Sequence, residues 1–408
     1  MLNKPLLGLT VAAMLMIQVM CVALHWNAIR RGNVDFAALI GTARLIGGGK
    51  VPNYDSLHVR VDSDSSAQQE EHVNPNTMSD TLHPPFESLL FLPLTFFPYL
   101  TAFVIWTISN LIFFWSVPAV LKDFLPRLRP EASWLAVIYA TSLPVLVCLM
   151  FGQDSILLLF LFSFSASSLA SNNDIRAGFL LALGLFKFQL VFPIFIVLIV
   201  LRRWRALAGF FYGSLSLLIA AVWMIGVEGI LRYIRFLFAV THHISTNTST
   251  RTVLMPNLRG LVSLLSGSSN HPTAQSFVIF VLSIAAIVGF VAWSRKFREL
   301  PIRYHFSLAV LVSSLISYHY YIYNAVILSI PFLLMANEFI DTKVHSKLRV
   351  IFAVSVFGSY GILLLSVFGI LPLEIGMAAL TLGSIGVVAV TASLPFSAIT
   401  VEHEYQEA

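Results

Sequence analysis

Long runs of apolar residues recur along the whole chain and restrict what it can fold into. A membrane-spanning helix needs about 20 apolar residues. Twelve candidate runs lie at about 5–26, 98–121, 133–150, 154–171, 175–186, 188–201, 205–226, 274–294, 303–318, 319–337, 348–369 and 372–392. Hydrophobic residues make up 57% of the 408 residues and charged residues only 11%, too few to surround a water-soluble core of this size. The sequence therefore predicts an all-α polytopic membrane protein with about twelve transmembrane helices, forming one integral membrane domain over 1–408.

Three of these runs allow a second interpretation. The runs at 175–186 and 188–201 are short, and either two broken helices or one kinked element fits them. The first run resembles a signal peptide, but it is longer than a typical signal-peptide core and lacks a small-x-small cleavage site. We therefore expect an uncleaved first span.

Lysine and arginine residues concentrate in short loops such as LRRWR at 201–205 and SRKFREL at 294–300. Cytoplasmic loops of membrane proteins carry such an excess of cations. With the N-terminus in the cytoplasm, two long segments at about 27–97 and 228–273 lie on the extracytoplasmic side of the cell membrane. The basic residues are otherwise scattered, so the net charge of +5 does not indicate nucleic-acid binding.

The first outer segment begins with an amphipathic stretch, DFAALIGTARLIGGG. Its apolar residues recur at helical spacing: Phe36, Leu39, Ile40, Ala43 and Ile46. This pattern predicts a helix that lies in the membrane interface. The three glycines at 47–49 are expected to end it.

Asp35 stands at the start of this stretch, just beyond the first apolar run. Spacing alone leaves two roles open for it, a helix N-cap or a functional carboxylate. A carboxylate at the edge of a bilayer is partly desolvated, which raises its pKa and makes it a better base. The functional interpretation makes Asp35 a catalytic base at the outer membrane surface.

Two further candidates lie in outer turns between apolar runs. Lys187, in GLFKFQLVF, is either a lysine that reaches towards lipid headgroups or a cation that holds a phosphate, because ionisable groups at such a depth are usually functional. His319, in SYHYYIYN, lies in a tyrosine-rich turn. That turn fits an aromatic belt at the membrane interface, and it also fits a phosphate-binding group or a proton shuttle.

The turn FGQDSILLL and the loop RTVLMPNLRGLV supply the remaining candidates. Gln153 is suited to hydrogen-bond a sugar or a phosphate, whereas the following Asp154 suits a helix N-cap. Arg251, Asn257 and Arg259 form either a loop that faces lipid headgroups or an anion-recognition site. The sequence contains no motif that predicts a metal site or a cofactor.

Several short motifs follow one another in a characteristic order. After an Asp behind the first span come GKVPNYD, PPFESLLFLPL, GQDSILLL, AGFLLALGLFK, RRWRAL, NLRGL and SYHYYIYNAVIL. From about residue 30 to residue 335, this order resembles glycosyltransferase family 87, the polyprenyl-phosphate-mannose-dependent mannosyltransferases of the membrane-embedded GT-C class.

The resemblance implies both a fold and a reaction. It implies the GT-C fold and an inverting transfer of a sugar, with mannose expected, from polyprenyl phosphate to a glycolipid or glycan acceptor on the outer face. On this resemblance Asp35 is the catalytic aspartate, and Lys187, His319 and Tyr54 of GKVPNYD contact substrate. A lipid-phosphate leaving group does not require a metal, so neither a metal nor a cofactor is expected.

The sequence departs from the family pattern at a few positions. Phe188 and Gln189 replace the proline that often follows the turn lysine, Asn324 stands where an Asp is frequent, and His83 stands where an aromatic residue is frequent. These departures concern the acceptor and the fine geometry of the donor site rather than the class of reaction.

A multi-span transporter or flippase of lipid-linked sugars is the alternative to an enzyme. That class predicts two related halves and ionisable groups near the middle of spans. Here the charges cluster at the ends of the apolar runs and no two halves match. The sequence therefore favours the enzyme.

Overall fold

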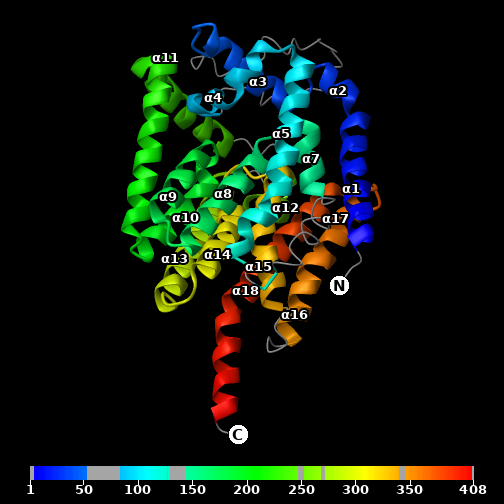
Figure 1. Ribbon diagram of the computed structural model, residues 1–408, viewed down its shortest axis with the longest axis vertical. Helices are drawn as coiled ribbons and strands as arrows, with labels where there is room; N and C mark the ends of the chain where they lie inside the picture. Colours follow the sequence, from blue (N-terminus) through cyan, green and yellow to red (C-terminus); the bar gives the residue numbers. More distant parts are fainter. Residues whose placement is uncertain are drawn as a thin grey trace.

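The chain folds into helices joined by turns, and no strand occurs in the part of the chain that the structure describes (Figure 1). The structure, a computed structural model, describes residues 4–52, 83–125, 127–128, 143–246, 252–267, 272–339 and 346–406. The predicted all-α class is confirmed over these residues. Tyr54 and Arg251 lie outside them.

The N-terminal half contains α1 (Lys4–Leu24), α2 (Trp26–Arg30), α3 (Asp35–Gly47), η1 (Pro85–Glu87), α4 (Ser88–Phe91), η2 (Leu92–Phe96), α5 (Tyr99–Val120), η3 (Leu121–Asp123), α7 (Leu143–Phe151), α8 (Ser155–Ala170), α9 (Asp174–Leu183), η4 (Gly184–Lys187) and α10 (Phe188–Val200). The C-terminal half contains α11 (Trp204–Thr246), η5 (Thr252–Leu254), α12 (Leu258–Ser266), α13 (Pro272–Lys296), α14 (Ile302–Ile316), η6 (Ile322–Leu328), α15 (Ser329–Phe339), α16 (Ser346–Ala353), η7 (Val354–Gly358), α17 (Ser359–Val367) and α18 (Leu373–Gln406). The η elements are 3₁₀-helices except η7, which is a π-helical turn.

Seven helical stretches of the described chain are long and apolar enough to cross a membrane. They are Tyr99–Val120, Asp174–Val200, Trp204–Phe238, Thr273–Lys296, Ile322–Phe339, Ser346–Val367 and Leu373–Leu394. Large apolar side chains on these stretches, such as Trp223, Phe277 and Phe357, face outward, as expected where lipid replaces water. The structure thus agrees with a polytopic membrane protein, while the predicted count of twelve spans is not confirmed.

Several predicted spans take a different form. The runs at 175–186 and 188–201 form one continuous stretch, Asp174–Val200, so the kinked-element interpretation holds. The runs at 154–171 and 303–318 become α8 and α14, helices of 16 and 15 residues. Most of the run at 133–150 lies outside the described residues.

Helix α3 forms where the amphipathic pattern predicts it and is followed by a glycine turn in which Gly49 has φ +71°. It is buried on more than its apolar face, because the small residues Ala37, Gly41 and Thr42 are also covered by protein. Elements α4, η2 and α11 pack around it. α3 is therefore embedded in the protein more deeply than a single apolar face predicts.

Helix α11 breaks at Gly226, which has φ +71° and ψ 169° and joins two helical pieces. The predicted span at 205–226 ends at this residue. The piece beyond it returns to α3, where Tyr233 and Phe236 form a small apolar cluster with Ile46 and Ile225. The two segments predicted to lie outside the membrane, 27–97 and 228–273, are thus in contact.

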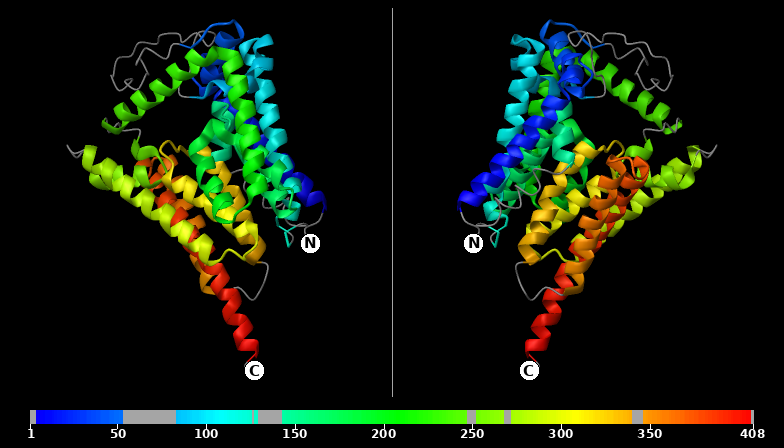
Figure 2. Two further views of the ribbon diagram at one scale, coloured as in Figure 1. Left: turned by 90° about the vertical axis from the view of Figure 1, so that its left-hand side faces the viewer. Right: turned by 90° about the vertical axis from the view of Figure 1, so that its right-hand side faces the viewer.

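Figures 1 and 2 show that α3 and α4 lie at one end of the molecule, beside the beginning of α5. The last part of α18 projects from the opposite end. The main apolar core runs between these ends and includes the fully buried Phe36, Phe103, Phe162 and Phe306.

Candidate active site

A cluster of polar side chains lies where the start of α3, the turn between α7 and α8, η4 and η6 meet. Helix α5 holds this turn from one side, because Trp106 Nε1 donates to the Gly152 carbonyl oxygen over 2.9 Å and Asn110 Nδ2 donates to that of Gln153 over 3.3 Å. Gly152 has φ +65°, and a Cβ there would lie 2.6 Å from Phe36 Cβ. Only glycine lets the turn approach α3 this closely.

Asp35 is the first residue of α3, and Val34 before it occupies the N-cap position in an extended conformation. The N-cap role left open for Asp35 is therefore wrong. The half-buried Asp35 carboxylate instead accepts a hydrogen bond at Oδ2 from Gln153 Nε2. Two predicted site residues, 118 positions apart, are thus in direct contact.

Lys187 ends η4 and is buried, with about 5% of its surface exposed. Its Nζ lies 2.5 Å from Asp154 Oδ1. It also donates to Ser155 Oγ over 2.6 Å and to Asn324 Oδ1 over 2.8 Å. These three partners match the three hydrogens of an ammonium group, so the lysine points into the protein and does not reach for headgroups.

Asp154 occupies the N-cap position of α8, as the sequence suggests, but its side chain makes no capping hydrogen bond. Its fully buried carboxylate is instead the counter-ion of Lys187. The adjacent Gln153 holds Asp35. Two consecutive residues of one turn therefore connect the carboxylate of Asp35 with the ammonium group of Lys187.

His83 and Glu87 add a part of the site that sequence reasoning did not predict. His83 Nδ1 lies 2.6 Å from Glu87 Oε2, and the Glu87 carboxyl group faces Asp154. Both acids lie outside the seven helical stretches that are long and apolar enough to cross a membrane. Burial, reinforced by the charge of Asp154, raises the pKa of Glu87 to about 8. Burial alone would raise the pKa of Asp154 as well, but the Lys187 charge and a hydrogen bond from Glu87 outweigh it and hold that pKa below its ordinary value.

The same three residues are the described ones whose donor atoms lie close enough to share a metal ion. One ligand atom each from His83, Glu87 and Asp154 falls within 4.8 Å of the others. However, Lys187 already neutralises Asp154, and the raised pKa keeps Glu87 protonated near neutral pH. The charges of this trio are therefore balanced by a lysine and a proton that the chain itself supplies.

His319 lies in the loop between α14 and η6, and its ring is 4.8 Å from that of Tyr321. Tyr321 stacks at 5.9 Å on Tyr323, and Lys187 Nζ lies 5.2 Å from the centre of the Tyr323 ring. His319 is half-buried. A continuous path of contacts thus joins His319 with Lys187 through two tyrosine rings.

Asn257 and Arg259 hold this tyrosine-rich loop by its backbone. Asn257 caps α12 by accepting from Gly260 N and donates to the Ser317 carbonyl oxygen over 2.7 Å. Arg259 donates to the Tyr318 carbonyl oxygen over 3.0 Å and lies 3.9 Å above the Tyr318 ring. These contacts support positioning of the loop, and direct contact with substrate remains a prediction for both residues.

The residues missed by the sequence reasoning left weak signals. Glu87 is the single acid in the apolar run PPFESLLFLPL, and His83 precedes it by four residues, a spacing that places two side chains on one helical face. His83 and Asn324 were both noted only as departures from a family pattern. Nothing in the local sequence indicates that Asn324 would meet Lys187.

Comparison with known proteins yields one match. The sequence model of glycosyltransferase family 87 matches residues 82–317, which is more than half of the chain. No curated protein and no solved structure matches it. The matched region contains Gln153, Lys187, Asn257 and Arg259. His319 lies two residues beyond its C-terminal end, and Asp35 lies 47 residues before its N-terminal end.

Proposed function

The chain belongs to glycosyltransferase family 87, and from this premise we propose which reaction it performs and with which residues. Family membership and seven apolar helical stretches make it a glycosyltransferase with membrane-spanning helices. We propose an inverting transfer of a sugar, with mannose expected, from a polyprenyl-phosphate donor to a glycolipid or glycan acceptor. The site faces the extracytoplasmic side of the cell membrane, on a GT-C fold.

The link between Asp35 and Lys187 through a single turn is the observation that carries this proposal. Gln153 donates to the Asp35 carboxylate, and its neighbour Asp154 lies 2.5 Å from Lys187 Nζ. Transfer from a lipid phosphate needs a base for the acceptor and a cation near the leaving group. Through Gln153 and Asp154, the turn brings a carboxylate that can act as the base and a lysine that can act as the cation into one site.

In the proposed reaction, Asp35 removes the proton from an acceptor hydroxyl group while the hydroxyl oxygen attacks the anomeric carbon of the donor sugar. The bond between that carbon and the phosphate oxygen breaks, and the lipid phosphate leaves with the electron pair. A single displacement of this kind inverts the anomeric centre. Asp35 acts as a base and forms no covalent bond to the sugar.

Lys187 receives the leaving phosphate by exchanging a neutral partner, Ser155 or Asn324, for a phosphate oxygen. Its contact with Asp154 persists during this exchange, which keeps the buried carboxylate paired. His319 acts at the other end of the tyrosine path as a phosphate-binding group or proton shuttle. Asn257 and Arg259 support it by holding the backbone of its loop.

The test is the substitution Asp35→Asn in purified protein reconstituted into liposomes with polyprenyl-phosphate mannose and a glycolipid acceptor. We expect sugar transfer to fall by about 10²- to 10⁴-fold, the usual contribution of a general base, while donor affinity is retained. Asp174→Asn is the matched control, because this carboxylate pairs with Arg203 and has no contact with the site. Unchanged turnover in the Asp35 variant would remove the mechanism.

A further inference from the structure

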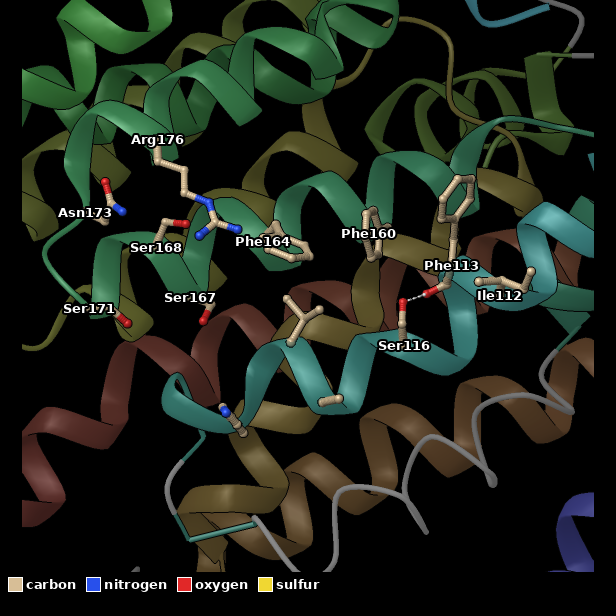
Figure 3. A pocket seen from close by; sticks show the side chains of 13 residues that line it. Ile112, Phe113, Ser116, Phe160, Phe164, Ser167, Ser168, Ser171, Asn173 and Arg176 are labelled. Atoms are coloured by element: carbon tan, nitrogen blue, oxygen red, sulfur yellow. Dashed lines mark hydrogen bonds between the residues drawn. The ribbon is translucent and has the colours of Figure 1, made fainter. Parts of the chain in front are cut away.

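A groove of about 610 Å³ runs between α5 and the helices α8 and α9, and the polar site makes no use of it (Figure 3). It is open along one side and mostly apolar. Its volume falls in the range of pockets that hold one small organic ligand. Its lining includes Phe113, Phe160 and Phe164 along the apolar part and Lys122 and Arg176 at one end.

The groove lies away from the candidate active site along α5. Asn110 is the last residue of this helix with a described contact to the catalytic turn. Val120, at the far end of the groove, is ten residues further on, which corresponds to about 15 Å of helix rise. A lipid phosphate at the far end of the groove would therefore occupy a different place from a donor phosphate near Lys187.

Three aromatic rings in contact with one another line the groove, and a cation lies at the end of this row. Phe113 and Phe160 lie 5.1 Å apart, and Phe160 and Phe164 also lie 5.1 Å apart. The Arg176 guanidinium stacks on Phe164 at 4.9 Å, and Figure 3 shows it reaching towards that ring. The row of rings offers an apolar surface to a hydrocarbon chain and fixes the arginine at the end of it.

The cationic end carries positive charge without an acid in the lining. Lys122 and Arg176 both border the groove, and no Asp or Glu does so among the described residues. Asp174, two residues before Arg176, pairs instead with Arg203 at 3.4 Å. The hydroxyl group of Ser168 lies beside the guanidinium group, and those of Ser167 and Ser171 lie farther along the same end of the groove (Figure 3). These hydroxyl groups can donate hydrogen bonds to a phosphate group.

We propose that this groove binds an anionic phospholipid from the leaflet opposite the candidate active site. Its phosphate lies between Lys122 and Arg176, and part of one acyl chain lies along Phe164, Phe160 and Phe113. The occupant is a bilayer phospholipid, because the cations lie at the end of an apolar track that is open along one side. Ile112, which lines this track on the candidate spanning helix α5, is 63% exposed. This inference does not depend on the proposed sugar transfer.

The test is native mass spectrometry of the full-length protein in detergent, titrated separately with dioleoyl phosphatidylglycerol and dioleoyl phosphatidylcholine. We expect the first phosphatidylglycerol molecule to bind about 30-fold more tightly than phosphatidylcholine, from two cations near a lipid phosphate. Lys122→Gln with Arg176→Gln should reduce this preference to less than about threefold. Arg205→Gln with Arg298→Gln is the matched control, because both arginines are exposed and lie outside the groove.

A second variant tests the apolar part while both cations stay in place. Ala119 lines the groove and is exposed, so Ala119→Phe fills the track without entering the packed core. We expect phosphatidylglycerol affinity to fall about tenfold, with an unchanged melting temperature. The proposal is overturned if the lipid preference survives the loss of Lys122 and Arg176, if the control pair loses it equally, or if Ala119→Phe leaves affinity unchanged.

Discussion

Lys187 and Asp154 form a buried ion pair, and each residue therefore affects both the stability and the chemistry of the site. Their contact of 2.5 Å lies in a region where both side chains are almost wholly enclosed. Removing one partner leaves a buried charge that costs several kcal/mol, whereas removing both can be nearly neutral. Loss of activity in a single Lys187 variant would thus combine a loss of stability with a loss of phosphate binding.

We expect Lys187→Met to destabilise the protein by about 3–5 kcal/mol, because Asp154 remains buried without its cation. Lys187→Met combined with Asp154→Asn should recover most of this loss. Thermal unfolding in detergent measures the stability of both variants, and titration with polyprenyl phosphate measures donor affinity. If Lys187 holds the phosphate, the double variant is folded and binds the donor at least about tenfold more weakly. A folded double variant with normal donor affinity would exclude that role.

Glu87 makes the stability of the site depend on pH. Its pKa is raised from 4.5 to about 8, first by burial and then by the charge of Asp154. The folded state therefore holds a proton that the unfolded chain releases above pH 4.5. The corresponding stabilisation is complete below pH 4.5 and is lost as the pH rises through about 8.

We accordingly expect the melting temperature of the protein to fall between pH 6 and pH 9, by an amount equivalent to at most about 1.4 kcal/mol per pH unit. Glu87→Gln keeps a neutral hydrogen-bonding group and should flatten this dependence. Differential scanning fluorimetry across this pH range is the measurement, with the exposed Glu299→Gln as the control. Equal slopes for the wild type and Glu87→Gln would show that Glu87 is not the group that titrates.

Single residues were predictable where their type is unusual for their surroundings. Lys187 and Asp35 are ionisable groups beside apolar runs, and this contrast indicated them without any knowledge of the fold. Asn324 joins Lys187 from 137 positions away, and no local pattern carries that information. Arg259 was identified from the sequence, but its role was not. The sequence does not distinguish an arginine that binds an anion from one that holds a backbone carbonyl group.

At the scale of the elements, helices α9 and α11 pack against each other very closely. A Cβ at Gly178 would lie 1.8 Å from the Ala206 carbonyl oxygen, and one at Gly209 would lie 2.0 Å from that of Ile175. Gly213 follows four residues after Gly209 and faces Ala182 at 2.6 Å. Small residues at this spacing let helix backbones approach within a membrane. Helix α9 leads directly into η4, so this packing also helps to place Lys187.

We expect Gly209→Leu to separate α9 from α11 and to reduce both stability and sugar transfer, because the new side chain meets backbone that has no room to move. Gly289→Leu is the matched control, since nothing lies within 4 Å of a Cβ at this position of α13. Melting temperature and yield of monodisperse protein are the measurements. If both variants behave like the wild type, the contact between α9 and α11 is not as tight as the structure has it.

The ends of helices were predictable where the apolar pattern stops at a glycine. The apolar period and three glycines set the position of α3, and Gly226 ends the predicted span at 205–226. The polar residue Lys187 suggested an interruption between two runs, but η4 accommodates it within one continuous stretch. A 3₁₀ turn changes the direction of a side chain without ending the helical path, and an apolar pattern does not reveal it.

At the scale of the whole molecule, apolar runs predict a membrane protein, but the number of spans that they predict is not confirmed. Helices α8 and α14 consist mainly of apolar and small residues, and most of their residues are buried. An apolar helix in a protein core and one in lipid have the same composition, and length alone separates them. The count of twelve could therefore not be obtained from composition alone.

The arrangement of the two ends leads to a prediction for the protein in its membrane. The end with α3 carries Asp35, and the cationic turns that contain Arg298 are expected on the cytoplasmic side. We therefore expect a membrane-impermeant maleimide to label Lys50→Cys in intact cells and Arg298→Cys only after permeabilisation. Both positions are exposed, and Cys21→Ser provides the background because Cys148 is buried. Labelling of Arg298→Cys alone in intact cells would place Asp35 on the cytoplasmic side, which would contradict transfer to an extracytoplasmic acceptor while leaving the geometry of the site unchanged.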